Sequence, residues 1–295
     1  MGTDTGFASP LRLFSENPVA VLEQLRQGYV DYMGWAADQV TDEHLLYALK
    51  SGLLDECAAA FPDPRLAPEI PIRVLLAACL AGAFQGEYAL SQAGPALTSP
   101  AVLAELGLNV QWVAPGAGLS RRGTAADGVF HSDTLRKLVG QIADADHKAG
   151  RRRGESLLRW WNETVGRALL RRAGGGTGAW IWDCTKLLVN LDNPRYEGSA
   201  VTKDEDGQPL RGYKLALLSS LIDSGRVIVQ VGWDSVRPAD ITVGRPLLQG
   251  DTPLEAGDTL LHDRGLIDGA LITCLKRDLG VDVVFGLKKL SLIHI

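Results

Sequence analysis

Ala179-Trp-Ile-Trp-Asp183-Cys-Thr-Lys186 is a short apolar run that ends in an aspartate, and Thr259-Leu-Leu-His-Asp263-Arg-Gly-Leu266 repeats this pattern later in the chain. Both runs have the length and composition of buried β-strands. A carboxylate at the end of such a strand lies where the sheet meets solvent. If the strands are neighbours, the two aspartates place negative charge in one cleft, which is costly unless a cation lies between them. The pair therefore predicts a divalent metal site.

Composition limits the kind of protein to which this site can belong. The chain has 295 residues, of which 46% are hydrophobic, and this is enough for two domains with cores of their own. The longest apolar stretch, 74–84, is too short to cross a bilayer, and the first residues lack a basic-then-apolar leader. We therefore expect a soluble, cytoplasmic protein without a membrane partner. Four scattered cysteines show no zinc-ligand spacing and are interpreted as reduced thiols.

Residues 1–172 are predicted to form a helical region. Apolar residues recur at a spacing of three to four over 19–35 and 41–61, and further helices are expected over 72–84, over 99–107 and from 131 onwards. Several short helices with tight turns are compatible with a helix-turn-helix-like DNA-binding bundle. They are equally compatible with any small helical domain, so both interpretations stay open.

An arginine-rich segment lies at the end of this region, although the whole chain carries a net charge of -5. Nearby acidic residues are few, namely Glu155 and Glu163, and two tryptophans lie within the segment. Arginines beside aromatic rings suit contacts with DNA phosphates and bases, whereas the alternative is a solvated helix with its tryptophans in the core. The candidate DNA-binding residues are Arg151, Arg152 and Arg153. A glycine-rich linker, 173–178, follows.

After this linker the periodicity changes from helical to extended. Strands are predicted over 180–182, 213–222, 226–233, 259–262 and 282–287, with a tight hairpin at Asp223-Ser-Gly225. Helices are predicted from Asp240 to Leu248 and from Asp268 to Leu279, with both aspartates as N-caps. The fold class is therefore α+β or α/β, with a helical N-terminal region followed by a mixed sheet and flanking helices.

The order β-β-β-α-β-α-β, with an aspartate after the first and the fourth strand, resembles the ribonuclease-H-like core of DDE transposases from bacterial insertion sequences. Four motifs carry the resemblance in the right order: Asp183-Cys-Thr-Lys186, Arg211-Gly-Tyr-Lys214, Pro238-Ala-Asp240 and Asp263-Arg-Gly-Leu-Ile-Asp268. The helical front is also similar to the N-terminal region of such transposases. The resemblance assigns the core to residues 179–289.

This resemblance implies a function and a set of site residues. Asp183 and Asp263 would be catalytic and would bind Mg²⁺ or Mn²⁺, which activates water and then a 3′-hydroxyl for DNA cleavage and strand transfer. Lys186, Lys214 and Arg264 would contact backbone phosphate. The partner would be double-stranded DNA at the element's ends and at the target, in the nucleoid, and a homodimer on DNA is compatible with this role.

The sequence departs from the family pattern at its end. The third carboxylate, a glutamate on a helix beyond the fifth strand, has no counterpart here. Leu290-Ser-Leu-Ile-His-Ile295 can be encoded by a transposon-end adapter used for sequencing libraries, so 290–295 are expected to be a tail on a truncated core. We therefore expect an inactive fragment with an under-coordinated metal site and with exposed apolar surface at Val283, Phe285 and Leu287.

Two alternatives stay open. The chain could be a non-catalytic DNA-binding remnant of a transposase. Asp183-Cys-Thr-Lys186 could also be the nucleophile motif of an aspartate-dependent phosphatase, but that family places a second aspartate where Thr185 stands. It also needs parallel strands rather than a hairpin at residues 223–225.

Overall fold

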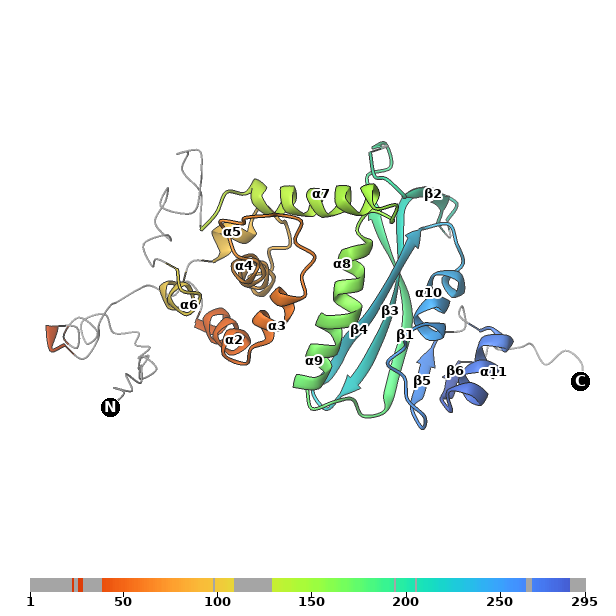
Figure 1. The fold of residues 1–295 in the computed structure, drawn as a ribbon. Helices are drawn as coiled ribbons and strands as arrows, with labels where there is room; N and C mark the ends of the chain where they lie inside the picture. The colour runs from red at the N-terminus through yellow and green to blue at the C-terminus, as the bar shows by residue number, and fades with distance from the viewer. Residues whose placement is uncertain are drawn as a thin grey trace, which may run out of the picture.

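The computed structural model describes residues 39–97, 99–108, 129–193, 195–204, 206–263 and 267–286, together with residues 23 and 26–28. These residues form a helical bundle and, beside it, a mixed sheet of six strands flanked by helices (Figure 1). An α+β fold is therefore confirmed. Among the described residues, no helix combines the length and the apolar character that crossing a membrane requires.

Within the part of the chain that the structure describes, six helices with one common core form the bundle. They are α2 (Gln39–Lys50), α3 (Leu53–Ala59), α4 (Ile72–Phe84), α5 (Ala93–Ala96), α6 (Pro100–Glu105) and α7 (Asp133–Lys148). Leu75 of α4, Leu103 of α6 and Phe130, which precedes α7, are fully buried in this core. The helix predicted from residue 99 starts there, because the Ser99 hydroxyl accepts a hydrogen bond from the Val102 N–H at the start of α6.

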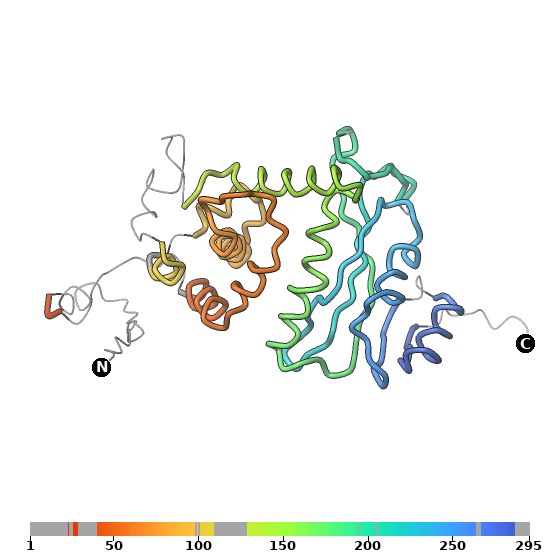
Figure 2. Tube along the Cα trace, in the orientation of Figure 1, coloured from red at the N-terminus to blue at the C-terminus, as the bar shows by residue number. Residues whose placement is uncertain are grey.

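One long helical segment joins the bundle to the sheet. α7 leads away from the bundle, and the chain then turns back as α8 (Glu155–Trp160), a π-helical turn η2 (Trp161–Val165) and α9 (Gly166–Arg172), as Figure 2 shows. These three elements run alongside β4 of the sheet (Figure 1). The arginine-rich segment therefore packs on the sheet, although it precedes the glycine-rich linker in the sequence.

In sequence order, the strands of the sheet are β1 (Ala179–Val189), β2 (Ala200–Lys203), β3 (Pro209–Ile222), β4 (Gly225–Ser235), β5 (Thr259–His262) and β6 (Asp282–Phe285). The central strand β1 pairs antiparallel with β3 on one side and parallel with β5 on the other. β3 also pairs with β4 and with the short β2, and β5 pairs parallel with β6. The parallel strands are connected through α10 (Asp240–Gln249) and α11 (Gly269–Asp278).

Local signals located some of these elements well and others poorly. β5 and the hairpin between β3 and β4 lie where the sequence predicts them. β2 was not predicted, because it is a short edge strand with a weak pattern. The predicted end of β1 at Trp182 is wrong. β3 is long enough to supply ladder partners as far as Val189, so Asp183 lies inside the strand rather than at its end.

The sheet core lies under α10 and α11. Trp182, Leu218, Leu260, Leu248 of α10 and Leu271 of α11 are almost fully buried in it. Gly244 allows α10 to approach closely, because a Cβ at this position would lie 2.2 Å from the Trp182 ring.

The opposite face of the last two strands is more exposed. Leu261 is 37% exposed and Val284 is 52% exposed. The expectation of exposed apolar surface at Val283 and Phe285 is wrong in its residues, because both are half-buried on the α11 side and Val284 is the exposed one. Leu287 lies outside the described residues.

The outer edge of β4 is covered by the helix beside it. The Asn162 side chain donates to the Val231 carbonyl at 3.0 Å and accepts from the Val231 N–H at 2.8 Å, so it satisfies both edge groups as a neighbouring strand would. One helical turn further, Gly166 lies against the Val229 backbone. Because unpaired strand edges promote strand addition by other chains, this helix protects the sheet from aggregation along β4.

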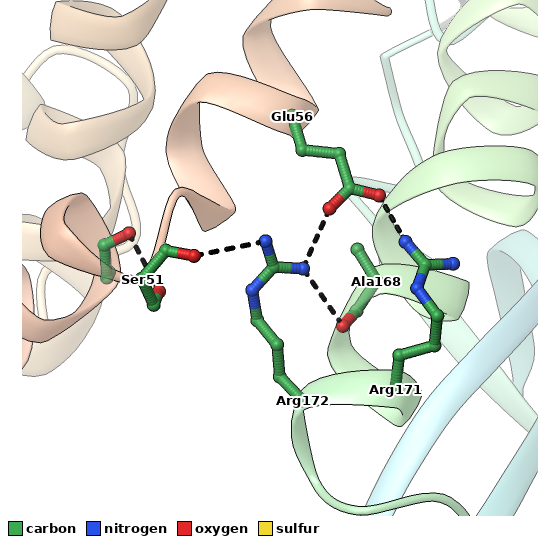
Figure 3. A network of polar contacts seen from close by, with 6 residues as sticks. Ser51, Glu56, Ala168, Arg171 and Arg172 are labelled. Carbon is green, nitrogen blue, oxygen red and sulfur yellow. Dashed lines mark hydrogen bonds and ion pairs between the residues drawn. The ribbon is translucent and has the colours of Figure 1, made fainter.

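The bundle and the sheet part are also joined by α3. Glu56 accepts hydrogen bonds from Arg171 and from Arg172, the second at 2.8 Å, and Arg172 also donates to the Ser51 carbonyl at 3.3 Å (Figure 3). Nearby, the Trp160 indole donates to the Cys57 carbonyl at 2.8 Å and packs edge-on against Phe61. Ion pairs and an aromatic contact thus fix α3 against α8 and α9.

We predict that Gly166→Ala destabilises the protein. The new Cβ would lie 2.0 Å from the Val229 carbonyl oxygen, and backbone on both sides cannot give way easily. Overpacking of this kind costs about 1–3 kcal/mol or more in the free energy of unfolding. Urea denaturation measures the change. The matched control is Gly140→Ala in α7, where the added methyl group would meet nothing outside its own turn of helix within 4 Å. This substitution should stabilise the fold by about 0.5–1 kcal/mol. Equal effects at the two glycines would contradict the close packing of α9 on β4.

We also predict a pH-dependent contribution from Glu56. The hydrogen bond from Arg172, with further attraction from Arg171, lowers the pKa of this carboxyl below 4.5 despite partial burial. A lowered pKa in the folded state means that the carboxylate stabilises the fold above pH 4.5, and that this contribution is lost as pH falls through the folded-state pKa. Glu56→Gln should therefore lower the free energy of unfolding by about 0.5–1 kcal/mol at neutral pH and by nothing at strongly acidic pH. A difference that does not change with pH, in urea denaturation, would contradict this. The exposed Glu87→Gln serves as the control.

Candidate functional site

The two aspartates that the sequence singles out lie level with each other. Trp182 of β1 pairs with His262 of β5 in the parallel ladder, and Asp183 and Asp263 directly follow these two residues. Neighbouring strands lie about 4.8 Å apart, and successive side chains point to opposite faces. Trp182 and His262 are buried on the α10 face, so strand alternation directs Asp183 to the opposite face. Asp263 would lie on that face too if the extended backbone continues for one residue past β5, and both aspartates are exposed.

Asp183 is held by the strand that contains it. Its neighbours on both sides pair with β3, Trp182 with Leu218 and Cys184 with Ala216. The Asp183 Oδ1 atom accepts a hydrogen bond from the Cys184 N–H at 2.8 Å. Backbone and one carboxylate oxygen are thereby fixed, and among the described residues no contact involves the other oxygen, Oδ2.

Asp263 is held in a different way, because it lies just beyond the last residue of β5. The His262 ring approaches the Asp263 carbonyl, with 2.8 Å between Nδ1 and the oxygen. His262 is 9% exposed and lies between the Trp182 and Phe285 rings. This histidine therefore both packs between two aromatic rings and forms a hydrogen bond to the residue that follows it.

The two candidate ligands are of the chemical type that hard divalent cations bind. Carboxylate oxygens are the ligands that Mg²⁺ and Mn²⁺ prefer, and the two strands supply one carboxylate each. The set is small in number, because no group of three or more His, Cys, Asp or Glu side chains suited to a metal occurs in the part of the chain that the structure describes. The pair therefore fits a loosely held cation.

Asp240 and Asp268 do not add to this pair. Asp240 was predicted as an N-cap, and this is wrong: Ala239 is the N-cap of α10, and the Asp240 carboxylate pairs with Lys214 instead. Asp268 is an N-cap, as predicted, since its side chain accepts from the Leu271 N–H at 2.8 Å. It also forms an ion pair with Arg245.

Lys214, a candidate phosphate contact, serves the fold instead. It is 7% exposed, and its Nζ lies 2.5 Å from both the Pro238 carbonyl oxygen and the Asp240 Oδ1 atom. The side chain thereby fixes the start of α10 on the sheet. It is buried on the α10 face because alternation along β3 places it beside Ala216 and Leu218, and a buried ammonium cannot reach a phosphate on the surface.

Two further residues, Lys186 and Arg264, were predicted to contact backbone phosphate near the aspartates. Lys186 is exposed, but it lies three residues beyond Asp183 on β1, so strand alternation directs it to the opposite face. Arg264 lies outside the described residues. The structure thus brings Asp183 and Asp263 together and does not bring a described lysine beside them.

A thiol lies directly beside the site. Cys184 follows Asp183 and packs half-buried against the sheet core, with its Sγ 3.7 Å from the Asp240 carbonyl oxygen. Burial, followed by the negative charge of Asp240, raises the pKa of this thiol to about 12.

The arginines of the predicted DNA-binding segment are engaged within the protein. Arg151 donates to the fully buried Asp146 carboxylate at 3.0 Å. The Arg152 guanidinium lies 3.3 Å from the centre of the Trp233 ring and donates to the Trp233 carbonyl at 2.8 Å.

Arg153 pairs with Asp144 and with Glu197, the latter at 2.9 Å. The hydrogen bond that it donates to Asp144 raises the pKa of this guanidinium further, so it stays charged. Both carboxylates are mostly exposed, at 62% and 70% of their side-chain surface. Sequence reasoning did not identify these acidic partners, because they lie on α7 and in the loop before β2.

A cavity among the described residues lies away from the aspartates. It has a volume of about 220 Å³ and lies between α8, η2 and α10, lined by Arg159, Glu163, Gln230 and Asp251 among others. It opens at the β4 side of the sheet, whereas the aspartates lie at the junction of β1 and β5. The aspartates are therefore separate from this cavity, and both are exposed.

Comparisons with known proteins add no information about this site. No protein-family model matches the chain, and no match was found among the curated proteins or the solved structures.

Proposed function

We propose that this chain is the DNA-binding and metal-binding part of a DDE transposase of a bacterial insertion sequence, with a ribonuclease-H-like sheet. One observation carries the proposal. Asp183 and Asp263 follow the paired residues Trp182 and His262 on adjacent parallel strands, and both are exposed. Two carboxylates on neighbouring strands repel each other when they come close, and a divalent cation between them relieves this repulsion.

The strand arrangement supports the same proposal. The order β4-β3-β1-β5-β6 has an antiparallel half and a parallel half that meet at β1. A mixed sheet of this kind is what the motif order implies, with the first aspartate on the central strand and the second at the end of its parallel neighbour. It does not suit the phosphatase alternative, which requires parallel neighbours on both sides of the nucleophile strand.

In this proposal Asp183 and Asp263 would hold the cation, and the chemistry follows from its charge. When bound, Mg²⁺ or Mn²⁺ supplies an activated water or 3′-hydroxyl for in-line displacement at a DNA phosphorus. Asp183 contributes a carboxylate whose Oδ1 is anchored by the Cys184 N–H. Both aspartates are exposed, as contact with a DNA backbone requires. The described residues supply two carboxylates, so we expect weak cation binding and little or no cleavage.

Metal binding provides the direct test. We predict that the protein binds Mn²⁺ with a Kd on the order of 10⁻⁴–10⁻³ M, the range of cation sites with few charged ligands. Asp183→Asn and Asp263→Asn should each abolish binding in calorimetric titration, since each removes half of the charge at the site. Asp223→Asn, in the exposed turn between β3 and β4, is the matched control and should bind as the wild type does. Binding that survives both site substitutions would end the proposal.

DNA binding tests the second half of the proposal. We predict that the protein binds duplex DNA with a steep salt dependence, because each neutralised phosphate releases a counterion and lowers the slope of log K against log salt by about 0.9. Replacing Arg152 and Arg153 together by glutamine should make the slope shallower by about 2, since the exposed carboxylates that they contact can give way to phosphate.

Arg151 is left unchanged in this experiment because it holds the buried Asp146. The control is the pair Lys276→Gln and Arg277→Gln on α11, which removes the same charge away from the arginine segment. A slope that stays the same in the Arg152 and Arg153 variant would show that these arginines serve only the fold. Binding with no salt dependence at all would contradict the DNA-binding role.

A further inference from the structure

We propose that His262 is a positioning residue that orients Asp263 for cation binding through a hydrogen bond to the Asp263 backbone. This inference rests on the proposed metal site and assigns a role to a residue outside the ligand pair. The Nδ1 atom of His262 lies 2.8 Å from the Asp263 carbonyl oxygen. A carbonyl only accepts, so Nδ1 carries the proton and donates it, and the imidazole is held in one tautomer.

The ring has little freedom to leave this position. Trp182 on β1 meets it edge-on, with 5.8 Å between ring centroids, and Phe285 on β6 stacks on it at 5.2 Å and 25°. The three residues are direct ladder partners across β1, β5 and β6, so they form one aromatic row on the α10 and α11 face. Packing from both sides therefore fixes the direction in which Nδ1 donates.

The two aspartates differ in how much they need such help. Asp183 lies between residues that pair with β3 on either side, and ladder bonds hold its backbone. Asp263 follows the last paired residue of β5, so the ladder with β1 and β6 stops just before it. The His262 bond adds a contact at the Asp263 carbonyl, directly beyond the end of the strand. By fixing this carbonyl, the bond limits the directions in which the Asp263 side chain can point.

Cation binding depends on this orientation because two carboxylates must meet at one point. Ligand groups need to be held within about 0.5 Å of the productive geometry. Losing a residue that orients a ligand typically costs about 10–100-fold in metal affinity. We therefore expect His262 to affect the affinity of the site without contacting the cation.

The experiment compares three substitutions by Mn²⁺ titration, with urea denaturation of each variant. His262→Phe keeps an aromatic ring in the row but removes the donor, and should raise the Kd about 10-fold or more. His262→Asn places an amide N–H near the position of Nδ1, and should stay within about 3-fold of the wild type, well short of the loss of an orienting group. His262→Gln places its amide near Nε2 instead, and should also raise the Kd about 10-fold or more. It tests the same loss of the donor if the phenylalanine variant does not fold.

The possible results separate this inference from the proposed function. If the wild type binds no Mn²⁺, or if Asp183→Asn leaves binding unchanged, the proposed metal site itself fails. If the wild type binds and depends on both aspartates, but the phenylalanine or glutamine variant binds equally well, the positioning role is overturned. It is also overturned if the asparagine variant loses affinity as much as the glutamine variant, because the ring would then act only through packing. Affinity retained by asparagine and lost with glutamine supports it.

Discussion

The parallel pairing of β1 with β5 is the constraint on which the rest of the sheet part depends. Trp180 and Trp182 place one face of β1 in the core, and their partners Leu260 and His262 do the same for β5. A slip of one residue would bring the tryptophans to the surface and separate the aspartates onto opposite faces. The close approach of α10 at Gly244 resists this slip, because the Trp182 ring occupies the space that a side chain at Gly244 would fill. Core packing and the alignment of the candidate site are thus one property of the register.

Short-range signals in the sequence sufficed for elements whose causes are local. β5 is bounded by turn residues and the β3–β4 hairpin by Asp223-Ser224, and Asp268 caps α11 with its own side chain. The level placement of the aspartates followed from the same patterns. What could not be predicted depends on distant partners. β1 continues past Asp183 because β3 is long, and Asp240 is drawn away from a capping role by a lysine on another strand.

The charge of the arginine segment also depends on partners that are distant in the sequence. Counted along the chain, its arginines face two glutamates, but in space they meet Asp146 and Asp144 of α7, Asp234 of β4 and Glu197 before β2. At such short range, each carboxylate offsets much of the potential that a linear count assigns to the segment. The tryptophans follow a similar rule, since Trp160 is half-buried and its indole donates a hydrogen bond to α3 of the bundle. A basic stretch therefore indicates where ion pairs form as readily as where phosphates bind.

Cys184 has a consequence for the chemistry of the exposed face. Only the thiolate reacts with oxidants and alkylating reagents, and at a pKa of about 12 almost none of it is present at physiological pH. Although Cys184 is the residue next to Asp183, hydrogen peroxide and maleimides should leave its thiol unmodified while the fold is intact. Slow labelling at this position would then report local opening of β1, so the cysteine is a built-in probe of whether the strand that carries the first carboxylate stays closed.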